Sequence, residues 1–151
     1  MEELLEMRQL LQAGRYPEAL ALATEIEDMG RTGLTHNIGN YLQVLLIHLI
    51  KQQAEQRTTH SWEVSIRNAV FEITDLNARP DDRGVYLTED EIRALLAHVW
   101  PNAVRRASLE VAEGHHTERD LFLLLDFTTI QEQALRLLYS PTDSDPTSPN
   151  G

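Results

Sequence analysis

Apolar residues recur along this chain at intervals of three and four positions, the spacing that places side chains on one side of an α-helix. The last apolar stretch, after Thr117, fits either one long helix or two shorter ones. No alternating strand pattern with hairpin turns accompanies them. We therefore predict an all-α fold, a single-domain helical bundle of about five to seven helices. The pattern predicts helices that begin near the following residues: Glu2, Pro17, Thr35, Thr59, Thr88 and Thr117.

Glycine and proline mark the expected ends of these helices. Because glycine is favoured just beyond a helix C-terminus, we expect the second helix to end near Gly30 and the third to be separate from it. Pro101 lies inside the fifth helix, where it removes a backbone hydrogen bond, so we expect a kink or a break beside Trp100. Five of the seven glycines fall where a helical pattern stops: Gly14, Gly30, Gly33, Gly84 and Gly114.

The two ends of the chain differ from its middle. Residues 140–151, S-P-T-D-S-D-P-T-S-P-N-G, contain no apolar side chain to offset the entropy of ordering. We therefore expect a helical bundle domain over residues 1–139 and a disordered tail over residues 140–151. The acidic N-terminus lacks the basic region of a secretory signal, so the cytoplasm is the expected location.

The most apolar run extends from Tyr41 to Lys51 and reads Y-L-Q-V-L-L-I-H-L-I-K. At about ten residues it is too short to span a bilayer, which needs roughly 20 apolar residues. Val44, Ile47 and Ile50 lie off the main apolar stripe, so this helix is apolar on nearly all sides. Such a helix is covered by several neighbours or shared with a partner subunit. We therefore treat Val44, Ile47 and Ile50 as a candidate interface.

Composition excludes several classes of protein. The chain has 13 Lys and Arg against 24 Asp and Glu, a formal net charge of −11, which repels a phosphate backbone. The absence of cysteine excludes disulfides, thiolate zinc sites and a cysteine nucleophile. Gly-rich phosphate-binding motifs do not occur, and neither does H-E-x-x-H. We expect no nucleic-acid partner, no membrane partner and no cofactor.

Five polar residues are candidates for a cluster. Glu25 and Asp28 flank the apolar stripe of the expected second helix, and His48 flanks that of the third. If these margins met, the three side chains would form a weak metal site or an acid/base pair, with Lys51 and Arg67 holding an anion. The alternative is structural: His48 and Lys51 each find a carboxylate or carbonyl partner, with Glu25 the best candidate. We favour the structural pair and expect no metal and no catalytic residue.

Trp62 and Trp100 lie on periodic apolar faces of two further helices. Large aromatic side chains at such positions usually anchor a core, and truncating one costs about 3–5 kcal/mol. We therefore predict both as core anchors rather than as ligand-stacking residues.

Four segments occur in an order that resembles a known family: T-E-I-E-D-M-G from Thr24, L-L-I-H-L-I-K from Leu45, S-W-E-V-S-I-R from Ser61 and W-P-N-A-V-R-R-A from Trp100. Together they resemble the bacterial family called domain of unknown function 29, over about Met1 to Leu138. The resemblance implies a compact α-helical protein without an established activity. Its recurrent residues match Glu25, Ile26, Gly30, His48, Lys51, Ser61, Trp62, Ile66, Arg67 and Pro101.

The chain also departs from that family's pattern in two places. Ala69 and Val70 stand where a Gln-Arg pair tends to follow the tryptophan helix. The segment from Asp126 to Thr129 replaces a Cys-Pro element. Any role that rests on those elements is not carried over to this chain.

These observations favour a non-enzymatic helical protein of the cytoplasm that binds a protein partner or a second copy of itself. The alternative is a metal- or small-ligand-dependent enzyme with a site around Glu25, Asp28 and His48. An antitoxin-like or regulatory binder is a third hypothesis, and only the acidic tail after Ser140 suggests it.

Overall fold

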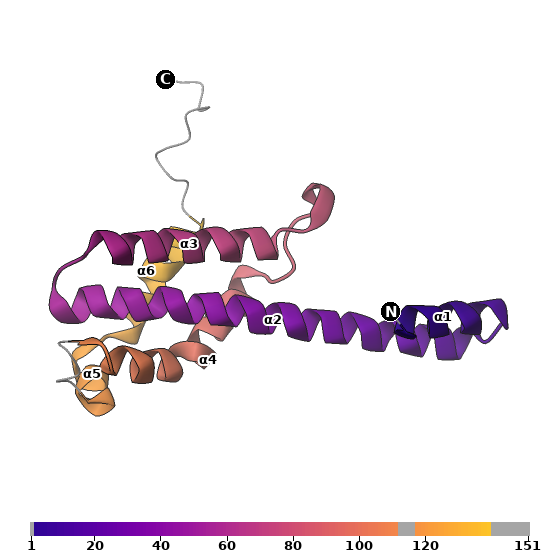
Figure 1. Cartoon of the computed structure of the whole chain (residues 1–151), viewed down its shortest axis with the longest axis horizontal. Helices are drawn as coiled ribbons and strands as arrows, with labels where there is room; N and C mark the ends of the chain where they lie inside the picture. The colour runs from indigo at the N-terminus through magenta and orange to yellow at the C-terminus, as the bar shows by residue number, and fades with distance from the viewer. Residues whose placement is uncertain (1, 112–116, 140–151) are drawn as a thin grey trace, which may run out of the picture. The chain divides into compact units, whose positions relative to one another are not determined.

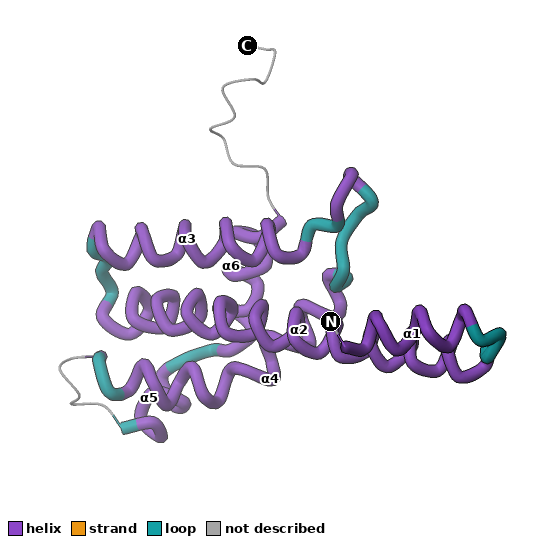
Figure 2. Tube along the Cα trace, turned by 45° about the vertical axis from the view of Figure 1, so that its right-hand side comes forward, coloured by secondary structure: helices purple, strands orange, loops and turns teal. Residues whose placement is uncertain are grey.

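The computed structural model describes residues 2–111 and 117–139. Figure 2 shows only helix and loop in this part of the chain, and one isolated bridge joins Ala78 to Val85. The predicted all-α fold is confirmed. The expected tail and Gly114 lie outside the described residues. The helices are α1 (Glu2–Gln12), α2 (Tyr16–Glu55), α3 (His60–Asn77), the 3-10 helix η1 (Pro80–Asp82), α4 (Glu89–Ser108), α5 (Glu118–Leu124) and α6 (Phe127–Tyr139).

Helix α2 runs without interruption from Tyr16 to Glu55, so the expected helix end near Gly30 is wrong. Glycine inside a helix costs roughly 1 kcal/mol relative to alanine. Ending the helix would instead leave several backbone groups without intrahelical partners, and extending an existing helix is favourable. Gly14 lies in the turn between α1 and α2 and Gly84 in the loop before α4, with φ angles of +75° and +98°.

The threonines at three helix starts act as caps. The Thr59 side chain accepts a hydrogen bond from the Trp62 backbone N–H at 3.1 Å. Thr88 forms a capping box with Glu91, and Thr117 forms one with Asp120. These starts confirm the sequence pattern. A threonine side chain accepts from a free backbone N–H of the first turn, and at Thr88 and Thr117 the acidic residue three positions later also accepts from the threonine's own N–H.

The two ambiguous regions of the sequence are also resolved. Helix α4 continues through Pro101 to Ser108, so the helix does not break there. The last apolar stretch forms two helices, because Leu125 has an extended backbone. Asp126 then accepts hydrogen bonds from the Thr128 N–H and the Thr129 hydroxyl, at 3.1 and 2.8 Å, at the start of α6.

The chain forms two compact units, and the boundary between them falls within α2, between Asn37 and Ile38. In the first unit, α1 lies antiparallel to the beginning of α2 (Figure 1). Its tight turn is closed by a hydrogen bond from the Arg15 N–H to the Leu10 carbonyl at 2.9 Å. Among residues 2–37 only Ala19 is buried. This helical hairpin therefore has almost no core of its own.

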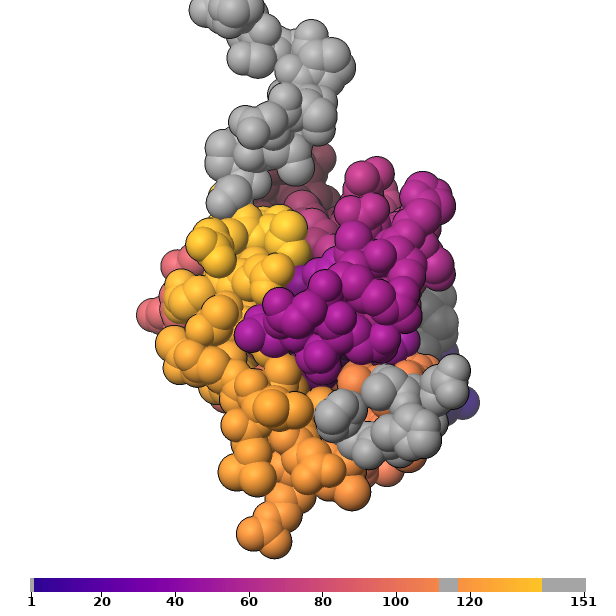
Figure 3. Space-filling model, turned by 90° about the vertical axis from the view of Figure 1, so that its left-hand side faces the viewer, coloured from indigo at the N-terminus to yellow at the C-terminus, as the bar shows by residue number. Residues whose placement is uncertain are grey.

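The second unit has a well-packed core. The part of α2 from Ile38 onward is its central helix, and α3 and α4 lie on opposite sides of it (Figure 1). Helix α6 contacts both α3 and α4. Figure 3 looks at the end of the bundle where α2 connects to α3 and shows α6, in yellow, beside this connection. The largest fully buried side chains are Ile38, Leu42, Leu45, Leu46, Leu49, Ile50, Ile92, Leu96, Val104, Val111, Leu121 and Ile130.

Polar side chains join the helices of this second unit. The Asn102 amide of α4 donates to Gln43 Oε1 of α2 at 2.9 Å. Arg93 of α4 donates to Glu132 of α6 at 2.6 Å, and this hydrogen bond raises the pKa of Arg93. Within the described part of the chain, every buried side-chain nitrogen or oxygen has a hydrogen-bond partner.

Candidate functional site

The candidate polar cluster is divided between the two units. Glu25 and Asp28 lie in the first unit with exposed side chains, whereas His48, Lys51 and Arg67 belong to the second. Glu25, Asp28 and His48 all lie on α2, so the expectation that they flank two facing helices is wrong. Among residues 2–111 and 117–139, no three His, Cys, Asp or Glu side chains are grouped so as to hold a metal ion.

His48 is paired within its own helix. Its Nδ1 lies 2.8 Å from the Val44 carbonyl oxygen, one turn earlier in α2. Because a carbonyl only accepts hydrogen bonds, Nδ1 carries the proton in this contact. The expected partner of His48 was a carboxylate or a carbonyl. The structure shows the Val44 carbonyl in this role, and not the Glu25 carboxylate that was the best candidate.

Lys51 is paired with a residue that follows α4. Its Nζ lies 2.5 Å from Glu110 Oε2, and only 12% of its side chain is exposed. The same Nζ lies 5.7 Å from the centre of the Trp62 ring on α3. Lys51 therefore ties α3 and the end of α4 to α2, and the expected carboxylate partner exists in Glu110 rather than Glu25.

A second cation lies over the same tryptophan. Arg57 Cζ is 4.8 Å from the Trp62 ring centre, and its guanidinium is paired with Glu55 at 3.0 Å. Cations over a tryptophan face are attracted by the ring quadrupole, which makes the two faces of the neutral ring partially negative. Lys51 and Arg57 are thus each paired with a carboxylate and lie near the same Trp62 ring. Arg67, the remaining member of the predicted cluster, is exposed on α3.

The candidate interface on α2 is largely part of the core. Ile47 is 6% exposed and Ile50 is 0% exposed, while Val44 is half-buried. The surrounding helices of the second unit cover these side chains, so a partner could reach Ile47 and Ile50 only by opening the bundle. The all-round apolar character of the helix therefore reflects cover by neighbouring helices of the same chain.

The two tryptophans differ in their surroundings. Trp100 is 7% exposed, and its ring centre lies 4.9 Å from that of Phe127 in α6. Trp62 is only half-buried, at the edge of the bundle beneath Lys51 and Arg57. Trp100 is thus a core residue, and Trp62 lies at the boundary between core and solvent.

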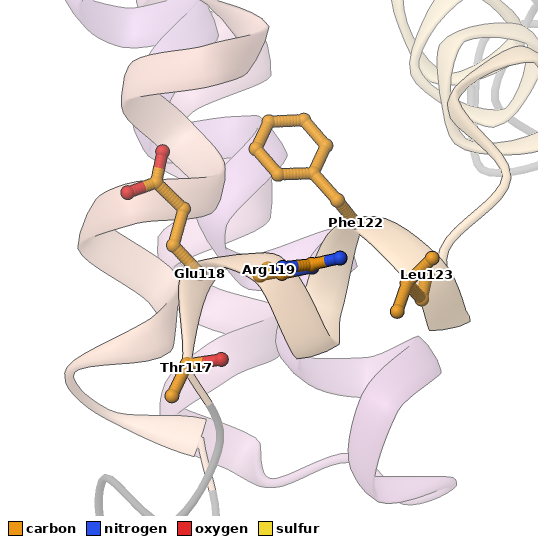
Figure 4. A pocket seen from close by; sticks show the side chains of 5 residues that line it. All are labelled: Thr117, Glu118, Arg119, Phe122 and Leu123. Atoms are coloured by element: carbon orange, nitrogen blue, oxygen red, sulfur yellow. The ribbon is translucent and has the colours of Figure 1, made fainter.

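One surface hollow, of about 460 Å³, lies over α5. Its lining consists of Thr117, Glu118, Arg119, Phe122 and Leu123, all from α5 and its N-cap. Figure 4 shows Phe122 and Leu123 pointing in different directions from the helix rather than converging. The side chains of Thr117, Glu118 and Arg119 also point in different directions, so the described lining residues do not form the convergent polar group that orients a small ligand.

The hairpin carries a feature that the sequence analysis missed. Leu10 is half-buried and Ala19 is buried, so these residues mark the side on which α1 and α2 meet. The next residue in each helix, Leu11 and Leu20, is exposed. Each step turns about 100° in the same sense. In two antiparallel right-handed helices, moving one residue onward from the contact rotates both side chains toward the same side of the pair. Leu11 and Leu20 therefore lie on one side of the hairpin.

Two more exposed apolar residues extend this side of the hairpin. Leu4 precedes Leu11 by two helical turns, and Tyr16 precedes Leu20 by about one, so each shares a side with its counterpart. All four side chains are exposed, Leu20 by 70%. We call Leu4, Leu11, Tyr16 and Leu20 the hairpin face. The signal in the sequence was the excess of apolar residues in α1 over what one neighbouring helix covers.

The fold and these sites define an all-helical protein with a well-packed bundle and a helical hairpin that has one exposed apolar face. The sequence matches the family described as Domain of unknown function DUF29 over residues 4–122. The chain belongs to this family, as its motifs indicated. Neither the curated proteins nor the solved structures contain a significant match. In the described residues, no helix is both long enough and apolar enough to cross a membrane.

Proposed function

We propose that this chain is a non-enzymatic protein-interaction module of the cytoplasm, and that it binds through the hairpin face. The observation that carries this proposal is the exposure of Leu4, Leu11, Tyr16 and Leu20 on one side of the hairpin, where Ala19 alone is buried among residues 2–37. Contiguous apolar side chains on a surface mark sites where a protein or a membrane is bound.

Helix stability supports the same proposal. Helix α1 has 11 residues and no buried side chain. Isolated helices shorter than about 12–15 residues are marginal in water, and most helical stability in proteins comes from packing of an apolar side. Burying the hairpin face against a partner would supply the packing that α1 lacks.

The acidic surroundings favour a protein over a lipid surface. Residues 1–37 contain Glu2, Glu3, Glu6, Glu18, Glu25, Glu27 and Asp28 against Arg8, Arg15 and Arg31. Helices that lie in membrane interfaces are typically rich in Lys and Arg, because they are attracted to anionic lipids. The hairpin has the opposite balance.

Site-specific photocrosslinking in the cells that produce the protein tests this proposal. A photoreactive residue replaces Leu20 on the hairpin face or, as the control, Asp28, which is exposed on the same helix. We expect a discrete protein adduct at position 20, lost when Leu4→Glu and Leu11→Glu are introduced, and none at position 28. Equal labelling at the two positions, or an adduct that survives both substitutions, would overturn the proposal.

A further inference from the structure

We infer that the hairpin face binds the same face of a second copy of this chain, so that two hairpins form a four-helix bundle. This inference rests on the proposed function and adds the identity of the partner. Three observations support it: the hairpin has almost no buried side chains, its charges are unevenly distributed, and the hairpin face is compatible with itself.

The first argument is the missing core. Two helices bury only the narrow strip along which they touch, and here that strip contains one buried residue among residues 2–37. In a four-helix bundle each helix has two neighbours, and its inward residues form a shared core. A second hairpin would therefore cover Leu4, Leu11 and Leu20 with side chains of the same kind.

The second argument concerns charge. The chain carries a formal net charge of −11, which by itself opposes association of two copies. However, Glu18 directly precedes Ala19, and Glu6 directly precedes Met7, which is half-buried like Leu10. Moving one residue toward the N-terminus rotates the side chain away from the hairpin face. Both carboxylates therefore lie on the opposite side of the hairpin.

The hairpin face itself carries charges of both signs. Arg8 directly follows Met7, and Glu27 directly follows Ile26, which is half-buried on the contact side of α2. Both charged residues therefore lie toward the hairpin face, and Arg31, about one turn after Glu27, lies on the same side of α2. Bringing two such faces together keeps the acidic sides apart and places opposite charges within reach of each other.

The third argument is symmetry. Most soluble homo-oligomers are closed, and two-fold dimers are the commonest. A two-fold contact uses the same patch on both copies, so the patch must be compatible with itself. A row of apolar side chains with charges of both signs beside it meets that requirement.

Sedimentation equilibrium of the full chain tests this inference. We expect a dimer at tens of micromolar and at least a tenfold increase in the dimer dissociation constant for Leu20→Glu. The matched controls are Leu5→Glu and Met29→Glu, at residues that are 56% and 64% exposed but lie off the hairpin face, compared with 70% for Leu20. These controls add the same charge and are expected to leave the dimer intact. Circular dichroism of each variant checks that the second unit stays folded.

A second measurement avoids any disruption of the fold. Because the chain has no cysteine, Leu11→Cys and Met29→Cys each introduce a single thiol. Under mild oxidation, we expect an intermolecular disulfide to form at least tenfold faster for Leu11→Cys than for Met29→Cys.

Each remaining outcome has a definite meaning. A monomer at all concentrations with equal disulfide rates overturns the inference, as does a dimer that Met29→Glu dissociates and Leu20→Glu does not. A monomer that still gives a specific adduct with a different protein at position 20 overturns the second-copy partner but leaves the proposed function standing. A monomer that gives no specific adduct at position 20 overturns both the second-copy partner and the proposed function.

Discussion

Asn77 and Leu87 exchange two hydrogen bonds across the loop that joins α3 to α4. The Asn77 side-chain amide donates to the Leu87 carbonyl at 3.0 Å, and the Leu87 N–H donates to Asn77 Oδ1 at 2.8 Å. Both residues are buried. One side chain thus satisfies the donor and the acceptor of a buried peptide backbone, as a neighbouring strand would.

This pairing makes Asn77→Asp a sensitive probe of the loop. A carboxylate still accepts from the Leu87 N–H but leaves the Leu87 carbonyl without a donor, so we expect a loss of about 1–3 kcal/mol in the free energy of unfolding. Urea denaturation measures this loss. Asn68→Asp, on the exposed side of the same helix, is the control and should change stability by less than about 0.5 kcal/mol. Equal effects at both positions would show that the paired hydrogen bonds do not hold the loop.

The pair of Lys51 and Glu110 should contribute little to stability despite its short distance. Glu110 is 56% exposed, so water can replace Lys51 as its partner. We expect a coupling free energy of about 0–1 kcal/mol between Lys51→Met and Glu110→Gln in a double-mutant cycle. Coupling well above that range would show that the pair behaves as a buried ion pair.

The two tryptophans should differ in their effect on stability. Trp100→Ala removes a core side chain that packs on Phe127, so we expect a loss of about 3–5 kcal/mol. Trp62→Ala should cost less, because Trp62 is already half in contact with solvent and its two cations can be hydrated. Urea denaturation of the two variants compares them directly. A larger loss for Trp62→Ala would contradict the assignment of the core.

Tyr139 should make stability depend on alkaline pH. Burial raises the pKa of Tyr139, and the Glu89 carboxylate adds to the increase. The folded state therefore holds the phenolic proton more tightly than the unfolded state. The resulting stabilisation is present below the unfolded pKa of about 10 and is lost as the pH rises through the higher folded value.

Ultraviolet absorbance of tyrosinate checks this expectation as a difference between the wild type and Tyr139→Phe. The phenylalanine variant should also lose that part of the alkaline decrease in stability. A Tyr139 signal that titrates at or below the ordinary value of about 10 would contradict it.

Helix periodicity and capping residues predicted the fold well. Thr59, Thr88 and Thr117 were found as helix starts from local sequence, because a cap is satisfied within one turn. The predicted helix end near Gly30 was wrong because the continuation of a helix through a glycine depends on the stability of the helical turns on either side. The partners of Lys51 and Asn77 are ten or more residues away in sequence, and only packing brings them together.

The candidate site was less predictable than the fold. The sequence pattern of an apolar residue on a helix is the same whether its side chain is covered by its own chain or by a partner. Ile50 and Leu20 illustrate this, since the first is 0% exposed and the second is mostly exposed. The difference lies in the number of neighbouring helices, which the local sequence does not encode.

Amide hydrogen exchange of α1 as a function of protein concentration tests the central claim most directly. If the hairpin face is covered by a second copy, amide protection over Leu4–Leu11 should rise with concentration in the wild type and not in Leu20→Glu. Protection over the core residues Leu42–Ile50 should stay constant in both. Protection of α1 that is equal at all concentrations and unchanged by Leu20→Glu would contradict the claim, because the hairpin would then be stable without a partner.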